Sequence, residues 1–297
     1  MDGQAARPAT PAPAGGHDAT EGTLLGGTVR YRQFRSGYRT GLEPVLMAAL
    51  VPARRGERVV EAGCGAGAGL LCLMQRVAGL EGVGIELDPD TAWLAGENFR
   101  SNGRDDLTVL NADITGCALR GLLSDSAAPC GCPPGICRPG PLPLDYRFDH
   151  AFANPPWHRV NTTPSPEGRR DKARRALPDT IPAWISALAA LLRPKGSLTL
   201  ALPADLAAPA LAACEKSDIG SAEIVPLWPE PGREARILLI RGRLHGRAGS
   251  RLLPGLVLHH AGGRFTPEAE AVLRDGQALF PETFRATHRR TRAFPSC

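Results

Sequence analysis

Asn154, Pro155, Pro156 and Trp157 form the most distinctive chemical group in this chain. They follow an apolar run, where a buried strand would deliver them to the edge of a sheet. The two prolines lack an N–H and fix φ, so they end the strand and leave a stiff corner with outward carbonyls. An amide, a free carbonyl and an aromatic ring held together can grip a flat substrate through an amino group and present that nitrogen for methylation. A proline turn with a core tryptophan is the alternative.

A second group lies in residues 58–69, where an apolar strand expected over 58–61 runs into a glycine-rich loop. Gly63, Gly65 and Gly67 allow tight turns and the close approach of a ligand. Apolar residues then recur at helical spacing, so the loop joins a strand to a helix. Glu86 ends the next apolar run about 20 residues on, where doubly wound folds bind ribose hydroxyls. A dehydrogenase would also fit this loop, and the tetrad at 154–157 argues against it.

The elements that must position these groups follow from the changes of hydrophobic period. A helix is expected with Pro89 at its first position; it continues over 90–102 and closes at Gly103. Strands are expected over 107–110, 150–153 and 197–202, with a buried crossover helix over 182–192. The last two strands, 222–228 and 235–242, are joined by too short a link for a helical crossover and should be antiparallel.

These elements predict an α/β fold, a Rossmann-like seven-stranded mixed sheet with the last strand antiparallel and helices on both faces. Strands one and four are neighbours in such a sheet. The glycine loop and the tetrad should therefore face each other at the switch point, where ligands bind.

Four motifs carry a family resemblance: E-A-G-C-G-A-G at 61–67, I-E-L-D at 85–88, N-A-D-I at 111–114 and N-P-P-W at 154–157. In order and spacing the chain resembles the class I S-adenosylmethionine-dependent methyltransferases, and among them the group that modifies amino nitrogens. Segments 35–50, 163–168 and 252–276 are similar to those of the bacterial tRNA(Val) adenine-N6-methyltransferases, which act on the adenosine after the anticodon.

The resemblance implies S-adenosylmethionine as cofactor and assigns roles to particular residues. Glu86 would take the ribose hydroxyls and Asp113 the adenine amine. Thr40 and Glu43 belong to a segment that folds over the cofactor in related enzymes. The residues on the methionine side would be Glu61, Gly63, Cys64, Gly65 and Gly67. A loop cap for Glu61 and a helix cap for Asp113 remain open.

The resemblance also implies the catalytic set Asn154, Pro155, Pro156 and Trp157. Asn154 Oδ1 and the Pro155 carbonyl would accept the two amino hydrogens, and Trp157 would stack on the base. An anticodon loop in tRNA supplies a base that can leave its stack at little cost in free energy. Three other readings remain open: a guanine-N2 methyltransferase of rRNA, a protein-glutamine methyltransferase, and an RNA-binding module that retained the fold.

Charge is concentrated in particular segments, although the formal net charge of the 297 residues is only +5. One arginine-rich segment, 30–39, interleaves Arg residues with Tyr31, Phe34 and Tyr38, a pattern that can bind phosphates and stack on bases. A second cluster follows the tetrad and is the expected RNA-binding set: Arg169, Arg170, Lys172, Arg174 and Arg175. A solvated arginine-rich face is the alternative.

Composition and length complete the expectations. No run of eighteen apolar residues occurs, so we expect a cytoplasmic protein without membrane contact. We also expect a monomer. A disordered tail over 1–23, one domain over 24–276 and a basic tail over 277–297 are expected. A Pro/Gly-rich insertion over 116–146 contains Cys130, Cys132 and Cys137, whose spacing matches no familiar metal site, so no metal is expected.

Overall fold

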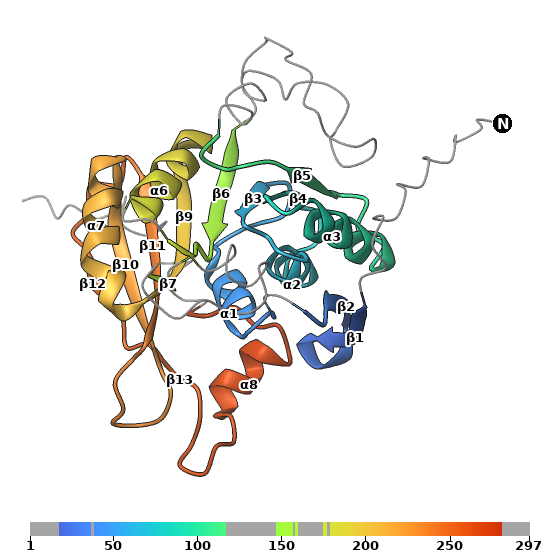
Figure 1. Cartoon of the computed structure of the whole chain (residues 1–297). Coiled ribbons are helices and arrows are strands. Elements are labelled where there is room, and N and C mark those ends of the chain that lie inside the picture. The colour runs from blue at the N-terminus through green and yellow to red at the C-terminus, as the bar shows by residue number, and fades with distance from the viewer. Residues whose placement is uncertain are drawn as a thin grey trace, which may run out of the picture.

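The computed structural model describes residues 18–36, 39–116, 147–156, 158–159, 175–176 and 179–280 (Figure 1). Its centre is a nine-stranded sheet in the order β12-β10-β11-β9-β6-β3-β4-β5, with β13 paired to β10. The longer strands are β3 (Arg58–Ala62), β4 (Glu81–Glu86), β5 (Leu107–Asn111), β6 (Phe148–Ala153), β9 (Leu192–Pro203), β10 (Ile219–Trp228) and β11 (Ile237–Leu244). The short edge strands are β12 (Arg251–Leu252) and β13 (Leu256–Val257).

The pairing of these strands confirms the expected Rossmann-like mixed sheet. β9, β6, β3, β4 and β5 are parallel neighbours in that order. β11 is antiparallel to both β9 and β10, as its short link to β10 requires. The sheet has nine strands rather than seven, because β12 and β13 add to its edge. Strands of two residues are too short to show a hydrophobic period, so they cannot be predicted from the sequence.

Helices cover both faces of the sheet, as Figure 1 shows. α1, α2, α3 and α8 share one apolar core, and α6 and α7 share a second. Val59 and Val60 of β3 belong to different cores, which places the two cores on opposite faces because strand side chains alternate. The helices are α1 (Glu43–Leu50), α2 (Ala68–Arg76), α3 (Pro89–Ser101), α6 (Thr180–Leu191), α7 (Ala207–Lys216) and α8 (Pro267–Leu273).

An N-terminal hairpin of β1 (Ala19–Leu24) and β2 (Val29–Phe34) forms a separate two-stranded sheet. β1 begins inside the segment expected to be a disordered tail. Tyr31 is 4% exposed and Phe34 7% exposed, so both rings pack in the core. The expectation that these two rings stack on bases is therefore wrong, since both are buried in the apolar core that they share with α1 and α2.

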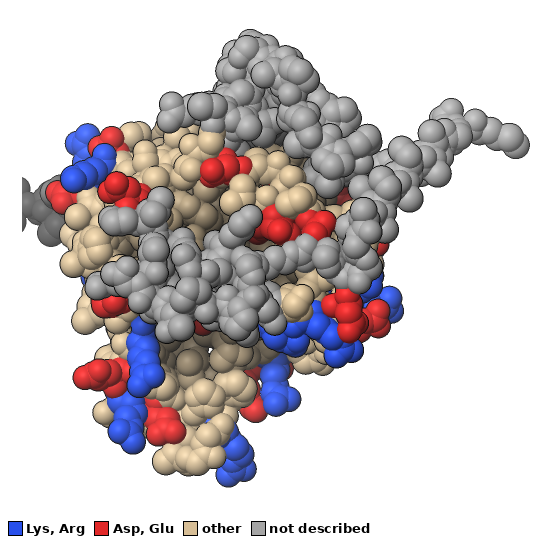
Figure 2. Space-filling view, viewed as in Figure 1, with Lys and Arg blue, Asp and Glu red and all other residues tan. Residues whose placement is uncertain are grey.

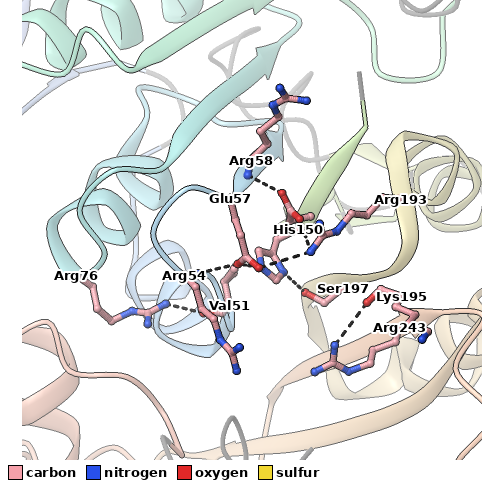
Figure 3. A network of polar contacts seen from close by, with 11 residues as sticks. Val51, Arg54, Glu57, Arg58, Arg76, His150, Arg193, Lys195, Ser197 and Arg243 are labelled. Atoms are coloured by element: carbon pink, nitrogen blue, oxygen red, sulfur yellow. Dashed lines mark hydrogen bonds and ion pairs between the residues drawn. The ribbon is translucent and has the colours of Figure 1, made fainter. Parts of the chain in front are cut away.

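A network of polar contacts joins the strands at the amino ends of β3 and β6 (Figure 3). His150 lies at its centre, with Nε2 at 2.8 Å from Glu57 Oε2 and Nδ1 at 2.7 Å from Ser197 Oγ. Asp149 accepts a hydrogen bond from the Arg58 N–H at 2.7 Å and forms an ion pair with Arg193. The network therefore links β3, β6 and β9 at the edge opposite to the glycine loop.

Several expected features lie outside the described residues. They are Trp157, the side chains of the cluster at 169–175, and the cysteines of the insertion. Only the backbone of Arg175 is described there, in the short strand β8 (Arg175–Ala176), which pairs with β7 (His158–Arg159). Within the described part of the chain, no helix is long and apolar enough to cross a membrane.

Candidate active site

The glycine loop and the tetrad begin at neighbouring strand ends. β3 and β6 are parallel, with Ala62 opposite Ala153. Gly63 and Asn154 directly follow these two strands, so they leave the sheet side by side at its carboxyl edge. Asn154 and Pro156 are half-buried and Pro155 is buried. The parallel register therefore brings together the two groups that the sequence singled out.

The glycine loop needs glycine for conformation and for space. Gly63, Gly65 and Gly67 have φ values of 62°, 55° and 87°, which side chains rarely adopt. A Cβ on Gly63 would lie 2.8 Å from the ring of Trp184, and one on Gly67 would lie 2.4 Å from Phe99. Larger residues at these two positions would push the loop away from its supporting helices.

Glu61 is a buried carboxylate behind the loop. It is 3% exposed, and its Oε2 accepts a hydrogen bond from the Leu70 N–H at 2.9 Å, in the first turn of α2. This bond satisfies one of the N–H groups that a helix start leaves unpaired. Burial raises the pKa of Glu61 well above its usual value, and the charge of Glu86 adds to the shift. The capping role left open by the sequence is therefore present in the structure.

Glu86 lies at the carboxyl end of β4 and holds the loop from its other side. Its Oε2 accepts from the Gly65 N–H at 3.0 Å, and its Oε1 accepts from the Asp88 N–H at 2.9 Å. Burial raises the pKa of Glu86, and these two N–H groups oppose the shift only in part. Each carboxylate oxygen can accept more than one hydrogen bond, so capacity remains for hydroxyl donors.

Cys64 is a structural member of the loop. It is 5% exposed, and its N–H donates to the Ile85 carbonyl at 3.1 Å, which ties the loop to β4. Burial raises the pKa of the Cys64 thiol well above its usual value, and the charges of Glu86 and Glu61 raise it further. The group is therefore a protonated thiol rather than a nucleophile.

Asp113 lies in the segment after β5 and is exposed. Its Oδ1 accepts from the N–H and the hydroxyl of Thr115, both at 2.8 Å. This bonding makes a local turn, and no helix begins there within the described residues. Its contact with a cofactor stays a prediction.

Thr40 and Glu43 lie in the segment that leads into α1. The Thr40 hydroxyl is 2.6 Å from the Tyr31 hydroxyl, and the Thr40 N–H donates to Gln33 Oε1 at 3.1 Å. Burial raises the pKa of Tyr31, the hydrogen bond with Thr40 lowers it, and the charge of Glu61 raises it further. Glu43 Oε2 is buried without a hydrogen-bond partner among the described residues. It is an acceptor that a ligand could satisfy.

Three further residues shape the site, although the motifs and spacing of the sequence assign them no role of their own. Leu87 follows Glu86 and is 65% exposed, so the carboxyl edge carries an apolar surface beside the carboxylate. Asn111 Nδ2 donates to the carbonyls of Glu86 and Leu87, both at 2.9 Å, and fixes their turn. Trp184 packs against Gly63 from α6. Of these three, only Leu87 has a signal in the sequence, because it is a large apolar residue directly after the glutamate that ends a strand.

The charged surface is mixed on the side of the molecule seen in Figure 2. Basic and acidic side chains alternate over the described residues, without a continuous basic field on that face. In the N-terminal hairpin, Arg32 and Arg35 are paired with Glu21 and Asp18. The hairpin arginines are therefore partly neutralised.

Comparison of the sequence with known proteins finds two similar relatives, and no protein-family model matches. A tRNA1(Val) (adenine(37)-N6)-methyltransferase from Dickeya chrysanthemi is 24% identical over 263 residues, covering 85% of this chain and 94% of the relative. Its counterpart from Yersinia enterocolitica is 25% identical over 260 residues, covering 85% and 93%.

Solved structures show the same fold. A predicted O-methyltransferase from Agrobacterium tumefaciens superposes with a TM-score of 0.61 at 24% identity, covering 80% of this chain and 97% of that one. A 16S rRNA N2 methyltransferase from T. thermophilus, in complex with AdoMet and guanosine, gives 0.50 at 22% identity, covering 78% and 52%. The chain thus shares the fold of solved methyltransferases, and its sequence is similar to the two tRNA1(Val) relatives over 85% of its length.

Proposed function

We propose that this chain is an S-adenosylmethionine-dependent N-methyltransferase that methylates the exocyclic amino group of an adenine in tRNA, next to the anticodon of tRNA(Val). One observation carries the proposal: the register of β3 and β6 sets Asn154 beside Gly63. A donor on the glycine loop and an amino group on Asn154 would then meet at one point of the sheet edge.

The residues around the loop suit this donor. When bound, S-adenosylmethionine supplies a methyl group on a positively charged sulfur. Glu61 and Glu86 flank the loop, and burial raises the pKa of each, so a nearby positive charge would favour their ionised forms. Glu86 offers acceptors for ribose hydroxyls, and the exposed Leu87 beside it offers an apolar surface for a base.

Asn154 and Pro155 would act on the nucleophile. The adenine amino group is planar because its lone pair is delocalised into the ring. If Asn154 Oδ1 and the Pro155 carbonyl accept its two hydrogens, the nitrogen is held with its lone pair free to face the donor. Catalysis then rests on orientation, and no strong base is required.

The choice of tRNA rests on the resemblance to the two relatives, which extends over most of the chain. In this proposal Trp157 stacks on the base, and the cluster of Arg169, Arg170, Lys172, Arg174 and Arg175 binds phosphates near the substrate entrance. Only the short segment 158–168 separates this cluster from the tetrad, so both can contact one loop of RNA.

The test uses labelled S-adenosylmethionine and four acceptors. These are an unmodified tRNA(Val) transcript, the same transcript with guanosine in place of adenosine 37, bulk rRNA, and release factor. The proposal predicts label in the first acceptor alone, recovered as N6-methyladenosine after digestion. Methylguanosine from rRNA or methylglutamine from release factor would contradict the adenine assignment, and the guanosine transcript controls for methylation elsewhere in the tRNA.

A further inference from the structure

Asn98 is a fully buried polar residue on α3 that the proposed mechanism does not use. Its Oδ1 accepts from the Arg32 N–H at 3.0 Å, and its Nδ2 donates to the Arg32 carbonyl at 2.8 Å. The same Nδ2 donates a second bond, at 2.9 Å, to the carbonyl of Ala66 in the glycine loop. One side chain thus bridges the edge of β2 to the loop between Gly65 and Gly67.

Asn102 directly follows α3, one turn beyond Asn98, and bonds to the same strand with no hydrogen bond to the loop among the described residues. Its Oδ1 accepts from the Arg30 N–H at 2.9 Å, and its Nδ2 donates to the Arg30 carbonyl at 2.8 Å. The remaining bond of Nδ2 goes to the Asn98 carbonyl within its own helix. Asn98 and Asn102 can bind Arg32 and Arg30 in the same way because the two spacings agree. Four residues along a helix rise about 6 Å, and two residues along a strand rise about 6.6 Å.

The loop is therefore fixed on both sides of Ala66. Gly65 donates its N–H to Glu86, and the Ala66 carbonyl accepts from Asn98. The neighbour of Asn98, Phe99, fills the space beside Gly67. The two hydrogen bonds set the peptide planes before Gly65 and after Ala66, and the Phe99 ring limits where Gly67 can lie.

We propose that Asn98 is a positioning residue for the methyl donor. By holding the Ala66 carbonyl from behind, it fixes the peptide plane that the donor's methionine end meets, and it braces that plane against the N-terminal hairpin. The inference rests on the proposed function only in taking S-adenosylmethionine as the ligand of the loop. It adds a residue that does not contact the ligand.

The test compares Asn98→Ala with Asn102→Ala, because both variants lose two bonds to the hairpin edge and only the first loses the tie to the loop. Calorimetric titration with S-adenosylmethionine should show the dissociation constant raised about tenfold or more by Asn98→Ala. For Asn102→Ala it should stay within about twofold of the parent chain. In methylation assays, Asn98→Ala should raise the KM for the donor while keeping most of kcat at donor saturation.

An isosteric variant covers the case in which Asn98→Ala does not fold. Asn98→Asp can still accept from the Arg32 N–H, but its carboxyl donates no hydrogen bond when ionised and only one when protonated, so the Arg32 and Ala66 carbonyls cannot both keep their donor. It should weaken donor binding as well. Equal dissociation constants for the Asn98 and Asn102 variants, or an unaltered one in Asn98→Asp, would overturn the inference. A parent chain that binds no S-adenosylmethionine would instead overturn the proposed function.

Discussion

Glu61 and Glu86 show how much a single residue's spacing can reveal. The position of each carboxylate relative to the glycines placed both beside the loop, and the structure finds them there. Their hydrogen-bond partners could not be read from the sequence, because these partners are backbone N–H groups of Leu70, Gly65 and Asp88. Glu61 anchors the helix start, whereas Glu86 keeps acceptor capacity for a ligand.

Glu86 should make donor affinity depend on pH. Its ionised form accepts hydroxyl hydrogens, and its pKa is raised by burial. Affinity should therefore fall as the pH drops through that raised pKa, earlier than for an exposed glutamate. Glu86→Gln should weaken S-adenosylmethionine binding by about 1–3 kcal/mol near pH 8 and should flatten this pH dependence. Calorimetry at several pH values measures both effects, and identical profiles for parent and variant would remove Glu86 from the donor site.

Gly63→Ala should lower stability and donor affinity more than the same substitution at another glycine with a positive φ. Gly56 also has a positive φ, 85°, but no atom lies within 4 Å of a Cβ placed there. Gly56→Ala therefore pays only the backbone penalty of about 1–2 kcal/mol. Gly63→Ala adds the contact with Trp184 and should unfold at lower urea concentration and bind the donor less tightly. Equal losses in the two variants would show that Trp184 moves aside freely.

The elements that the sequence revealed are those with strong local signals. The β10–β11 pair was predictable because its link is too short for a helix, and α3 because Pro89 and Gly103 mark its limits. The β1–β2 hairpin was not recognised. Val29 and Tyr31 alternate with Arg30 and Arg32 at the strand period, but the same interleaving of arginines and aromatic rings is also typical of nucleic-acid binding. Its contacts with α3 join residues far apart in the chain, which no local pattern encodes.

The polar network at the opposite sheet edge gives a second pH-dependent quantity, stability (Figure 3). Burial opposes ionisation of Glu57, but the hydrogen bond from His150 and the charges of His150 and Arg193 together lower its pKa. A depressed pKa means that Glu57 stabilises the fold above its unfolded pKa and loses that contribution as pH falls through its folded pKa. Glu57→Gln should therefore be less stable than the parent chain at pH 7, with the difference shrinking toward pH 3. Chemical denaturation at both pH values measures it, and a constant difference would contradict the linkage.

At the scale of the whole molecule, the parallel sheet separates two tasks. Its carboxyl edge carries the glycine loop, Glu86 and Asn154, while its amino edge carries the network around His150. Motif order was enough to predict the first arrangement, because parallel strands deliver their ends to one edge. The second could not be predicted, since His150 and Ser197 meet only through the register of β6 and β9.

The central claim is that Asn154 acts on the nucleophile and leaves the donor site intact. Single-turnover methylation of the unmodified tRNA(Val) transcript by Asn154→Ala, with donor affinity measured on the same preparation, tests it most directly. Losing a hydrogen bond made mainly in the transition state should slow methylation on the order of a hundredfold or more, with the donor dissociation constant unchanged. A fully active variant would contradict the account, since Asn154, Pro155 and Pro156 would then be no more than a structural turn.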